Sequence, residues 1–317
     1  MGFFSFLYRQ RFVHPKPLPS SIDLKGQTLL ITGGNTGIGL EATRELIAHN
    51  VSHVILAVRT ISKGEAARQD LIKTNPKCVV EIWELDLESF SSVCAFGKKA
   101  QLLDRLDIVF LNAGLKKLEF FTAASGHEMT VQVNHLSTAL ASLMIMEPMI
   151  ESARKIGKPG RMVITSSGVH IKASNILRRL DEKDSFGTQP ERYNVSKLLN
   201  VLWARKLATK TSPDQVVINT VNPGLCLSNL HRDESSAAFA TFNKIFGRPA
   251  IEGGYFLADA AVNQEKGSHG SYISEQKVIP ASTWVLSAEG AAVQKKLWKE
   301  TVELLRTEVP EADLKWT

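Results

Sequence analysis

A tyrosine and a lysine four residues apart could carry out proton transfer. They are Tyr193 and Lys197 in the stretch YNVSK, and an α-helix would place both side chains on one face, one turn apart. A phenol with a pKa of about 10 is a poor acid–base catalyst at neutral pH, but a nearby cation favours the phenolate and lowers that pKa. Tyr193 could then give a proton to a carbonyl oxygen or take one from an alcohol. The alternative is a buried structural helix whose lysine points outward.

Three further polar residues precede this pair in an order that suits the same chemistry. Ser167 follows the expected strand 161–165, and its hydroxyl could hydrogen-bond the reacting oxygen, an effect worth roughly 10²–10³ in rate at other oxyanion sites. Asn134 falls in the preceding long helix and could hold a water that relays protons to Lys197. His170 lies three residues past Ser167 and either lines the pocket or is a hydrogen-bonded structural histidine.

A glycine-rich turn lies between the expected strand 28–32 and the helix that follows it. Gly33, Gly37 and Gly39 would allow the turn, let backbone amides approach a pyrophosphate and let the helix pack closely on the strand. The free N–H groups and the positive end of the helix dipole would then face the phosphates. The spacing is Gly-x-x-x-Gly-x-Gly rather than the commoner Gly-x-Gly-x-x-Gly, so an ordinary turn is the alternative for this stretch taken alone.

The end of the second strand predicts which dinucleotide binds. An acidic residue usually holds the ribose hydroxyls at this point, but the stretch HVILAVRT ends in Arg59, with Lys63 one helical turn on. A guanidinium can clasp a ribose 2′-phosphate and stack on adenine, so NADP(H) is favoured over NAD(H). Asp86 is placed to bond the adenine amino group, and residues 112–114 would form the floor beside the ribose. Plain surface roles for Arg59 and Lys63 are the alternative.

Strands and helices alternate along most of the chain. Apolar runs predict strands at 28–32, 53–58, 79–85, 107–111, 161–165, 215–221 and 270–274. Helical spacing predicts helices at 88–103, 126–155, 192–209, 251–262 and 287–305. This order predicts an α/β fold, a single Rossmann-type doubly wound parallel sheet with helices on both faces.

Local signals add detail to this outline. Ser62 and Glu65 have the spacing of a capping box and predict the start of a helix there. The long helix 126–155 should be interrupted near Pro148.

A lid insertion is expected after the sixth strand, at about 225–249, because this connection is long and mixes polar with aromatic residues. Its side chains suggest a pocket for a medium to large, partly apolar carbonyl or secondary alcohol, although the phenylalanines could instead form a packed subdomain. The residues concerned are Leu230, Arg232, Asp233, Phe239, Phe242 and Phe246. The predicted organisation is an N-terminal arm at 1–24 and one domain at 25–317 that ends with the helix 287–305.

Composition narrows the class of protein. The 317 residues carry a formal net charge of +6, but no basic run or interleaved aromatic pattern points to nucleic acid. The three cysteines lack metal-ligand spacing, so we expect no metal and a reduced, cytoplasmic protein. The N-terminal aromatic cluster is too short for a membrane span and is expected to lie on the domain surface as an arm. The alternative is a weak interfacial anchor through Phe3, Phe4, Phe6, Leu7, Arg9 and Arg11.

Together, these motifs resemble the short-chain dehydrogenase/reductase family over about residues 25–275. The motifs that carry the resemblance are TGGNTGIG at 32–39, Asn112-Ala113-Gly114, Asn134, Ser167, Tyr193 with Lys197, and Pro223-Gly224 with Ser228. VILAVRT, RYNVSKLLNVL and NPGLCLS further resemble the retinol-dehydrogenase-like branch and its fungal relatives, many of which act in secondary metabolism. The resemblance implies that Pro223, Gly224 and Ser228 contact the carboxamide side of the nicotinamide. It also implies a homodimer formed through the helices that carry Asn134 and Tyr193.

The sequence therefore predicts an NADP(H)-dependent oxidoreductase that interconverts a ketone or aldehyde and an alcohol by hydride transfer. Its substrate would be a small molecule such as a polyketide or terpenoid. The candidate catalytic residues are Asn134, Ser167, Tyr193 and Lys197. The candidate cofactor residues are Gly33, Asn35, Thr36, Gly37, Ile38, Gly39, Arg59, Lys63, Asp86, Leu87, Asn112, Ala113, Gly114, Tyr193, Lys197, Pro223, Gly224 and Ser228.

Two other functions stay open at this point. One is an NADP(H)-sensing binding protein that has lost the chemistry, and the intact Ser167, Tyr193 and Lys197 argue against it. The other is a membrane-associated retinoid or lipid dehydrogenase, which keeps the chemistry and differs in location.

Overall fold

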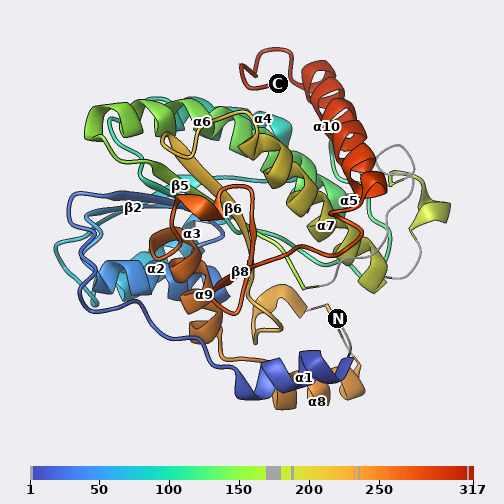
Figure 1. The fold of residues 1–317 in the computed structure, drawn as a ribbon, viewed down its shortest axis with the longest axis horizontal. Coiled ribbons are helices and arrows are strands. Elements are labelled where there is room, and N and C mark those ends of the chain that lie inside the picture. Colours follow the sequence, from blue (N-terminus) through green and yellow to red (C-terminus); the bar gives the residue numbers. More distant parts are fainter. Residues whose placement is uncertain (1–2, 169–179, 187–188, 232, 235, 313) are drawn as a thin grey trace.

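One sheet of eight strands runs through the computed structural model, in the order β3-β2-β1-β4-β5-β6-β7-β8 (Figure 1). All neighbouring strands are parallel except β7 and β8, which pair antiparallel. The structure describes residues 3–168, 180–186, 189–231, 233–234, 236–312 and 314–317. The strands are β1 Thr28–Thr32, β2 His53–Val58, β3 Val79–Glu84, β4 Ile108–Leu111, β5 Gly160–Thr165, β6 Val216–Asn222, β7 Tyr272–Ser274 and β8 Lys277–Ile279.

Helices cover both faces of this sheet (Figure 1). The α-helices are α1 Phe3–Phe12, α2 Gly37–Ala48, α3 Ile61–Leu71, α4 Phe90–Ala100, α5 Met129–Val131, α6 Ser137–Ile156, α7 Gln189–Ala208, α8 Ala237–Phe246, α9 Ala250–Val262 and α10 Ala288–Glu308. Helices α2, α3 and α9 lie on one face, and α4, α6 and α7 lie on the other. The expected α/β fold with a doubly wound sheet is confirmed.

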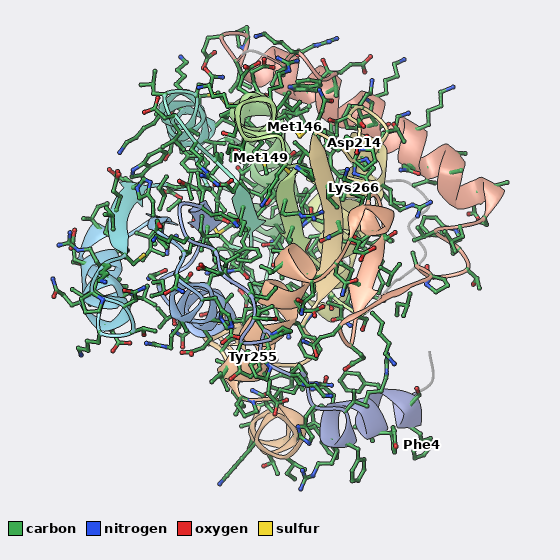
Figure 2. All side chains as sticks on the ribbon, turned by 60° about the vertical axis from the view of Figure 1, so that its left-hand side comes forward. Phe4, Met146, Met149, Asp214, Tyr255 and Lys266 are labelled. Carbon is green, nitrogen blue, oxygen red and sulfur yellow. The ribbon has the colours of Figure 1, made fainter. Side chains whose placement is uncertain are left out.

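The apolar runs form strands because both sides of each central strand are buried. In β1, Leu29 and Ile31 pack into the core beneath α2 and α9, whereas Leu30 packs into the core on the opposite side. On that second side, Met146 and Met149 of α6 are fully buried, and Figure 2 shows both in the interior of the molecule. A central strand such as β4, Ile108–Leu111, is accordingly apolar on both of its faces.

Two predicted helix details are wrong. The helix after β2 begins at Ile61 with Thr60 at its N-cap, so Ser62 lies inside α3 and does not open a capping box. The long helix is not interrupted at Pro148, which lies within α6. The irregular part is instead a π-helical segment at Gln132–Leu136, between α5 and α6. Side-chain contacts of Asn134, described below, hold this wider turn in place.

The N-terminal arm and the lid lie side by side. The arm contains α1, a helix that the sequence analysis did not predict, and α1 packs against α8 of the lid (Figure 1). The strand β8 was also not predicted. It pairs with β7 through a turn in which Glu275 and Gln276 have positive φ.

Helix α10 packs along α7, at the surface where the family resemblance implied a dimer contact. The Trp203 ring of α7 stacks on Trp298 of α10 with ring centroids 4.4 Å apart, and Gln294 donates to the Leu202 carbonyl. Within the described residues, no helix is long and apolar enough to cross a membrane. The homodimer stays a prediction, and α10 occupies part of the α7 surface available to it.

Replacement of Trp203 should destabilise the fold strongly. Trp203 is almost fully buried and also donates from Nε1 to Ser142 Oγ over 2.9 Å. We expect Trp203→Ala to lower the free energy of unfolding by about 3–5 kcal/mol, because it leaves a large cavity and removes the hydrogen bond donated to the Ser142 hydroxyl. Urea denaturation followed by circular dichroism measures this. The exposed Leu102→Ala serves as control, with a change within about 0.5 kcal/mol, and an equal effect of both substitutions would contradict the prediction.

Candidate active site

The carboxyl ends of the parallel strands open into one cavity of about 1040 Å³. In open α/β sheets this edge is where ligands bind, because the loops after the strands diverge there. The predicted site residues that line the cavity are Gly33, Asn35, Thr36, Gly37, Ile38, Arg59, Lys63, Asp86, Leu87, Asn112, Ala113, Gly114, Ser167, Tyr193, Lys197, Pro223, Gly224 and Ser228. Gly39 and Asn134 lie behind this lining.

The glycine turn after β1 is shaped for a phosphate group. Gly33 has φ +69°, a conformation that favours glycine, and a Cβ on Gly39 would lie 2.6 Å from the Gly33 carbonyl oxygen. Thr36 is the N-cap of α2, yet its side chain makes no capping bond to the first turn. Its hydroxyl instead accepts from Asn229 Nδ2 over 3.1 Å. The N–H groups of the α2 terminus are therefore available to an anion in the cavity.

Thr32 joins this turn to the loop after β4, a role that the sequence analysis did not assign. Its Oγ1 accepts from the backbone N–H groups of Asn112 and Ala113, both over 3.0 Å. Asn112 Nδ2 donates in return to the Thr32 carbonyl over 3.2 Å. The two cavity-lining loops are thereby fixed at a constant separation.

Arg59 faces the cavity at the adenine end of the expected site, but it already has a partner. Its Nη1 lies 2.6 Å from Glu88 Oε1, and the Arg59 side chain is 58% exposed. Glu88 also lines the cavity, and its backbone N–H donates to Asp86 Oδ1 over 3.0 Å. The sequence analysis identified Arg59, Lys63 and Asp86 and missed Glu88. The Glu88 carboxylate would therefore compete with a phosphate group for the Arg59 guanidinium.

The lysine of the predicted pair is deeply buried. Lys197 is 4% exposed, its Nζ donates to the Thr165 carbonyl over 3.1 Å, and it lies 5.8 Å from the centroid of the Tyr193 ring. Burial lowers the pKa of Lys197 to about 8. Burial raises the pKa of Tyr193, with a smaller contribution from the Cys226 thiol. In the protein alone, Tyr193 is therefore a protonated phenol at neutral pH.

Asn134 fixes the elements around Lys197. Its Nδ2 donates to the Leu115 carbonyl and to Ser196 Oγ, and its Oδ1 accepts from the Leu115 N–H, all within 2.9 Å. A Cβ on Gly114 would lie 3.0 Å from Asn134 Oδ1 and 3.2 Å from Lys197 Nζ, so these three residues are adjacent. The Asn134 side-chain amide thus joins the π-helical segment and the loop at Leu115 to α7. A proton relay through Asn134 stays a prediction.

Ser167 lies at the same edge of the sheet and is held by a hydrogen bond from β7. Its carbonyl accepts from the Tyr272 hydroxyl over 3.1 Å, a contact that the sequence analysis missed. The neighbouring Ser166 donates through Oγ to the Lys197 carbonyl over 3.0 Å, which ties the end of β5 to α7. The two predicted catalytic elements therefore form one rigid unit. His170 falls outside the described residues.

The lid contributes to the cavity differently from the prediction. Leu225, Cys226 and Leu230 line it, whereas the three phenylalanines of α8 are not among the described lining residues. Arg232 lies outside the described part of the chain. Phe6, Arg9 and Gln10 of α1, which the sequence analysis placed in a surface arm, also line the cavity.

Comparison with known proteins agrees with this geometry. The family model for short chain dehydrogenase matches residues 27–178. The chain is 50% identical over 282 residues to the short chain dehydrogenase sol3 of Alternaria solani, and the match covers 87% of this chain and 98% of sol3. The chain belongs to the short-chain dehydrogenase family. This short-chain dehydrogenase is therefore an oxidoreductase of a family that uses NAD(H) or NADP(H).

Solved structures show the same fold. The Pseudomonas aeruginosa RhlG/NADP active-site complex matches with a TM-score of 0.63 at 20% identity, covering 81% of this chain and 97% of RhlG. The 3-ketoacyl-(acyl-carrier-protein) reductase of Brucella melitensis, complexed with NADH, matches with a TM-score of 0.60 at 18% identity, covering 80% and 97%. One neighbour holds NADP and the other NADH, so this short-chain dehydrogenase shares its fold with users of either dinucleotide.

The buried charge of Lys197 should make stability depend on pH. The folded protein releases this proton near pH 8, whereas an unfolded lysine holds it to a pH of about 10.4. The unfolded state therefore binds more protons between these values, and stability contributed by this group rises with pH across that window. We expect Lys197→Met to raise the free energy of unfolding at neutral pH by about 1–3 kcal/mol and to flatten this dependence. Urea denaturation of the cofactor-free protein at several pH values measures it. If Lys197→Met instead lowered the free energy of unfolding at neutral pH, the lowered pKa assigned to Lys197 would be contradicted.

Proposed function

We propose that this protein is an NADP(H)-dependent reductase or dehydrogenase that interconverts a carbonyl group and an alcohol. The observation that carries the proposal is that Tyr193, Lys197 and Ser167 line the same cavity as the glycine turn and Arg59. A dinucleotide laid along this cavity from Arg59 would end beside Tyr193. The carbonyl and the alcohol are the groups on which a phenol can act as proton donor or acceptor at that end.

The residues present fit a phosphorylated nicotinamide dinucleotide. The glycine turn offers backbone N–H groups to a pyrophosphate. The absence of a Cβ at Gly39 leaves room for the Gly33 carbonyl and the Asn112 side chain beside α2. Arg59 and Lys63 are cations at the ribose end, where a 2′-phosphate would lie. The Pro223–Gly224 turn borders the catalytic end. When bound, the cofactor supplies or accepts the hydride.

The proton chemistry follows from the burial of Tyr193 and Lys197. Because the pKa of Tyr193 is raised, its phenol is protonated and can donate to a carbonyl oxygen that gains negative charge. The Lys197 ammonium lies next to the ring and favours the phenolate that remains. Ser167 borders the same space and would donate a hydrogen bond to the reacting oxygen. In the reverse direction the phenolate takes the proton of the alcohol.

The size and lining of the cavity support a medium to large, partly apolar substrate. Leu225, Leu230, Ile279 and Pro280 give its outer end apolar walls, while Glu275 and Ser282 add polar groups. A cavity of about 1040 Å³ lies at the upper end of the usual range for a small-molecule site, which leaves room for both cofactor and substrate. We infer a polycyclic or long-chain substrate, such as a polyketide or terpenoid.

Tyr193→Phe should abolish turnover and leave cofactor binding intact. The substitution removes the proton donor and keeps the ring, so kcat should fall by roughly 10²–10⁴ while the Kd for NADPH changes less than about twofold. The assay follows NADPH absorbance with a panel of aromatic and polyketide-like ketones. Unchanged turnover in Tyr193→Phe would contradict the proposed role. Tight NADPH binding without turnover of any ketone or alcohol would favour the sensing protein instead.

Arg59 and Glu88 should set the preference for the phosphorylated cofactor in opposite directions. Arg59→Asp should weaken NADPH binding by about 10–100-fold through loss of charge-assisted bonds, with little effect on NADH. Glu88→Gln frees Arg59 and removes a repelling carboxylate, so it should tighten NADPH binding by about 3–10-fold and leave NADH unchanged. Fluorescence titration with both dinucleotides measures these affinities. A preference for NADH in the unchanged protein would overturn the cofactor assignment.

A further inference from the structure

The N-terminal helix α1 reaches the catalytic end of the cavity. Gln10 is 5% exposed, its Nε2 donates to the Leu225 carbonyl over 2.8 Å and to the Phe246 carbonyl over 2.9 Å, and its Oε1 accepts from the Leu225 N–H over 3.2 Å. A Cβ on Gly224 would lie 2.4 Å from Gln10 Oε1, so α1 rests directly on the Pro223–Gly224 turn. An arm that only lay on the surface would not require a buried side chain that is hydrogen-bonded to backbone groups of the lid. The contact makes α1 part of the wall beside the expected nicotinamide position.

A buried arginine holds the carboxyl end of α1. Arg248 Nη2 donates to the Arg9 carbonyl and Nη1 to the Val13 carbonyl, both over 2.7 Å, and Nε donates to Gln10 Oε1 over 3.3 Å. These carbonyls lie at the negative end of the helix dipole, where a cation is favoured. The Arg248 side chain is 1% exposed, and its charge is paired with Glu275 at 3.1 Å. Such a buried cation is stable only while all of these acceptors stay in place.

The inner side of α1 offers an aromatic ring and a cation to the cavity. Phe6 and Arg9 both line it. Arg9 donates from Nε to the Ser5 carbonyl, and no carboxylate among the described residues lies within 4.0 Å of its guanidinium. Glu275, which also lines the cavity, is paired with Arg248 at 3.1 Å and interacts electrostatically with Arg9 from a greater distance. On the outer side of the same helix, Phe4 is 84% exposed and points away from the body of the molecule (Figure 2).

We infer that α1 is the outer wall of the substrate end of the cavity and that Arg248 is the positioning residue that holds it there. Phe6 and Arg9 then select a substrate with an aromatic or otherwise apolar body and an anionic group, such as a carboxylate or phenolate. This inference rests on the proposed function, because it requires the cavity beyond Tyr193 to be the substrate site. It specifies the charge of the substrate, and it adds α1 as a second element that determines substrate specificity.

The first experiment tests the role of Arg248 in the full-length protein through the reactivity of Cys226. This thiol is 6% exposed, lines the cavity and lies between Leu225 and Leu227, which bond to Gln10 and Arg248 respectively. In Arg248→Met, release of α1 should raise the rate of maleimide labelling at Cys226 by at least about tenfold. Cys78 and Cys94 are buried elsewhere and report global unfolding.

Each labelling outcome decides the role of Arg248. Labelling of Cys226 alone supports the inference, and labelling at the wild-type rate in a folded Arg248→Met protein overturns it. If all three cysteines react, Arg248→Lys replaces the first variant, since it keeps the charge and loses the forked contact. With a ketone that is turned over, release of α1 should raise KM at least about fivefold while kcat changes less than about twofold.

The second experiment tests Phe6 and Arg9 with anilinonaphthalene sulfonate, an aromatic anion that changes fluorescence on binding. The protein is first saturated with NADP⁺, so the dye can enter only the substrate end. Phe6→Ala and Arg9→Gln should each weaken dye binding by about 5–30-fold, through loss of apolar contact and of the charged bond. Phe4→Ala is the matched control on the outer side of α1 and should change binding less than about twofold.

The outcomes separate this inference from the proposed function. Absence of dye binding to the unchanged protein, or weakening by Phe4→Ala but not by Phe6→Ala, overturns the substrate assignment. Failure of the unchanged protein to bind NADPH or NADP⁺ would instead refute the proposed function itself.

Discussion

The burial of one charged side chain, Lys197, constrains most of the site. An ammonium group at 4% exposure loses much of its hydration, so the protein must supply fixed acceptors and exclude competing arrangements. The Thr165 carbonyl accepts from it, Ser166 ties the Lys197 backbone to β5, and Asn134 joins the Leu115 loop to α7 through Ser196. These contacts connect three elements from different parts of the chain. These bonds hold Lys197 beside Tyr193, and the burial of its charge costs stability that the proposed proton transfer would account for.

A second buried cation organises the opposite wall. Arg248 joins α1, the lid and the β7–β8 turn through contacts with Arg9, Gln10 and Glu275. The guanidinium needs several acceptors in one plane, and the chain brings them from its N-terminus and from near its C-terminal strands. The cavity thus has one side organised around the buried Lys197 and an outer side organised around the buried Arg248. We therefore expect the position of this outer side to control the access of substrate to the cavity.

Arg59 contrasts with both because it is largely exposed. Its ion pair with Glu88 lies at the surface, where water screens it and where such a pair contributes little to stability. The pair is consequently easy to open, and under the proposed function a 2′-phosphate would displace Glu88 from Arg59. The proposed cofactor preference would then depend on a balance between two acceptors for the same guanidinium, whereas the position of Lys197 depends on buried hydrogen bonds.

The sequence by itself determined the chain order of the parallel strands and of the main helices that connect them, and it identified the glycine turn, Arg59, Ser167, Tyr193 and Lys197 as residues of the cavity. It did so because strands covered on both faces and glycine turns leave local signals in composition and spacing. Only the tertiary structure showed the π-helical turn at Asn134, whose side chain bonds to Leu115 and Ser196, and the inward position of α1. Gln10 and Arg248 are 238 residues apart, and no local pattern connects them. A buried hydrogen-bond network of this kind becomes visible only when the fold brings its members together, because each residue is unremarkable in its own segment.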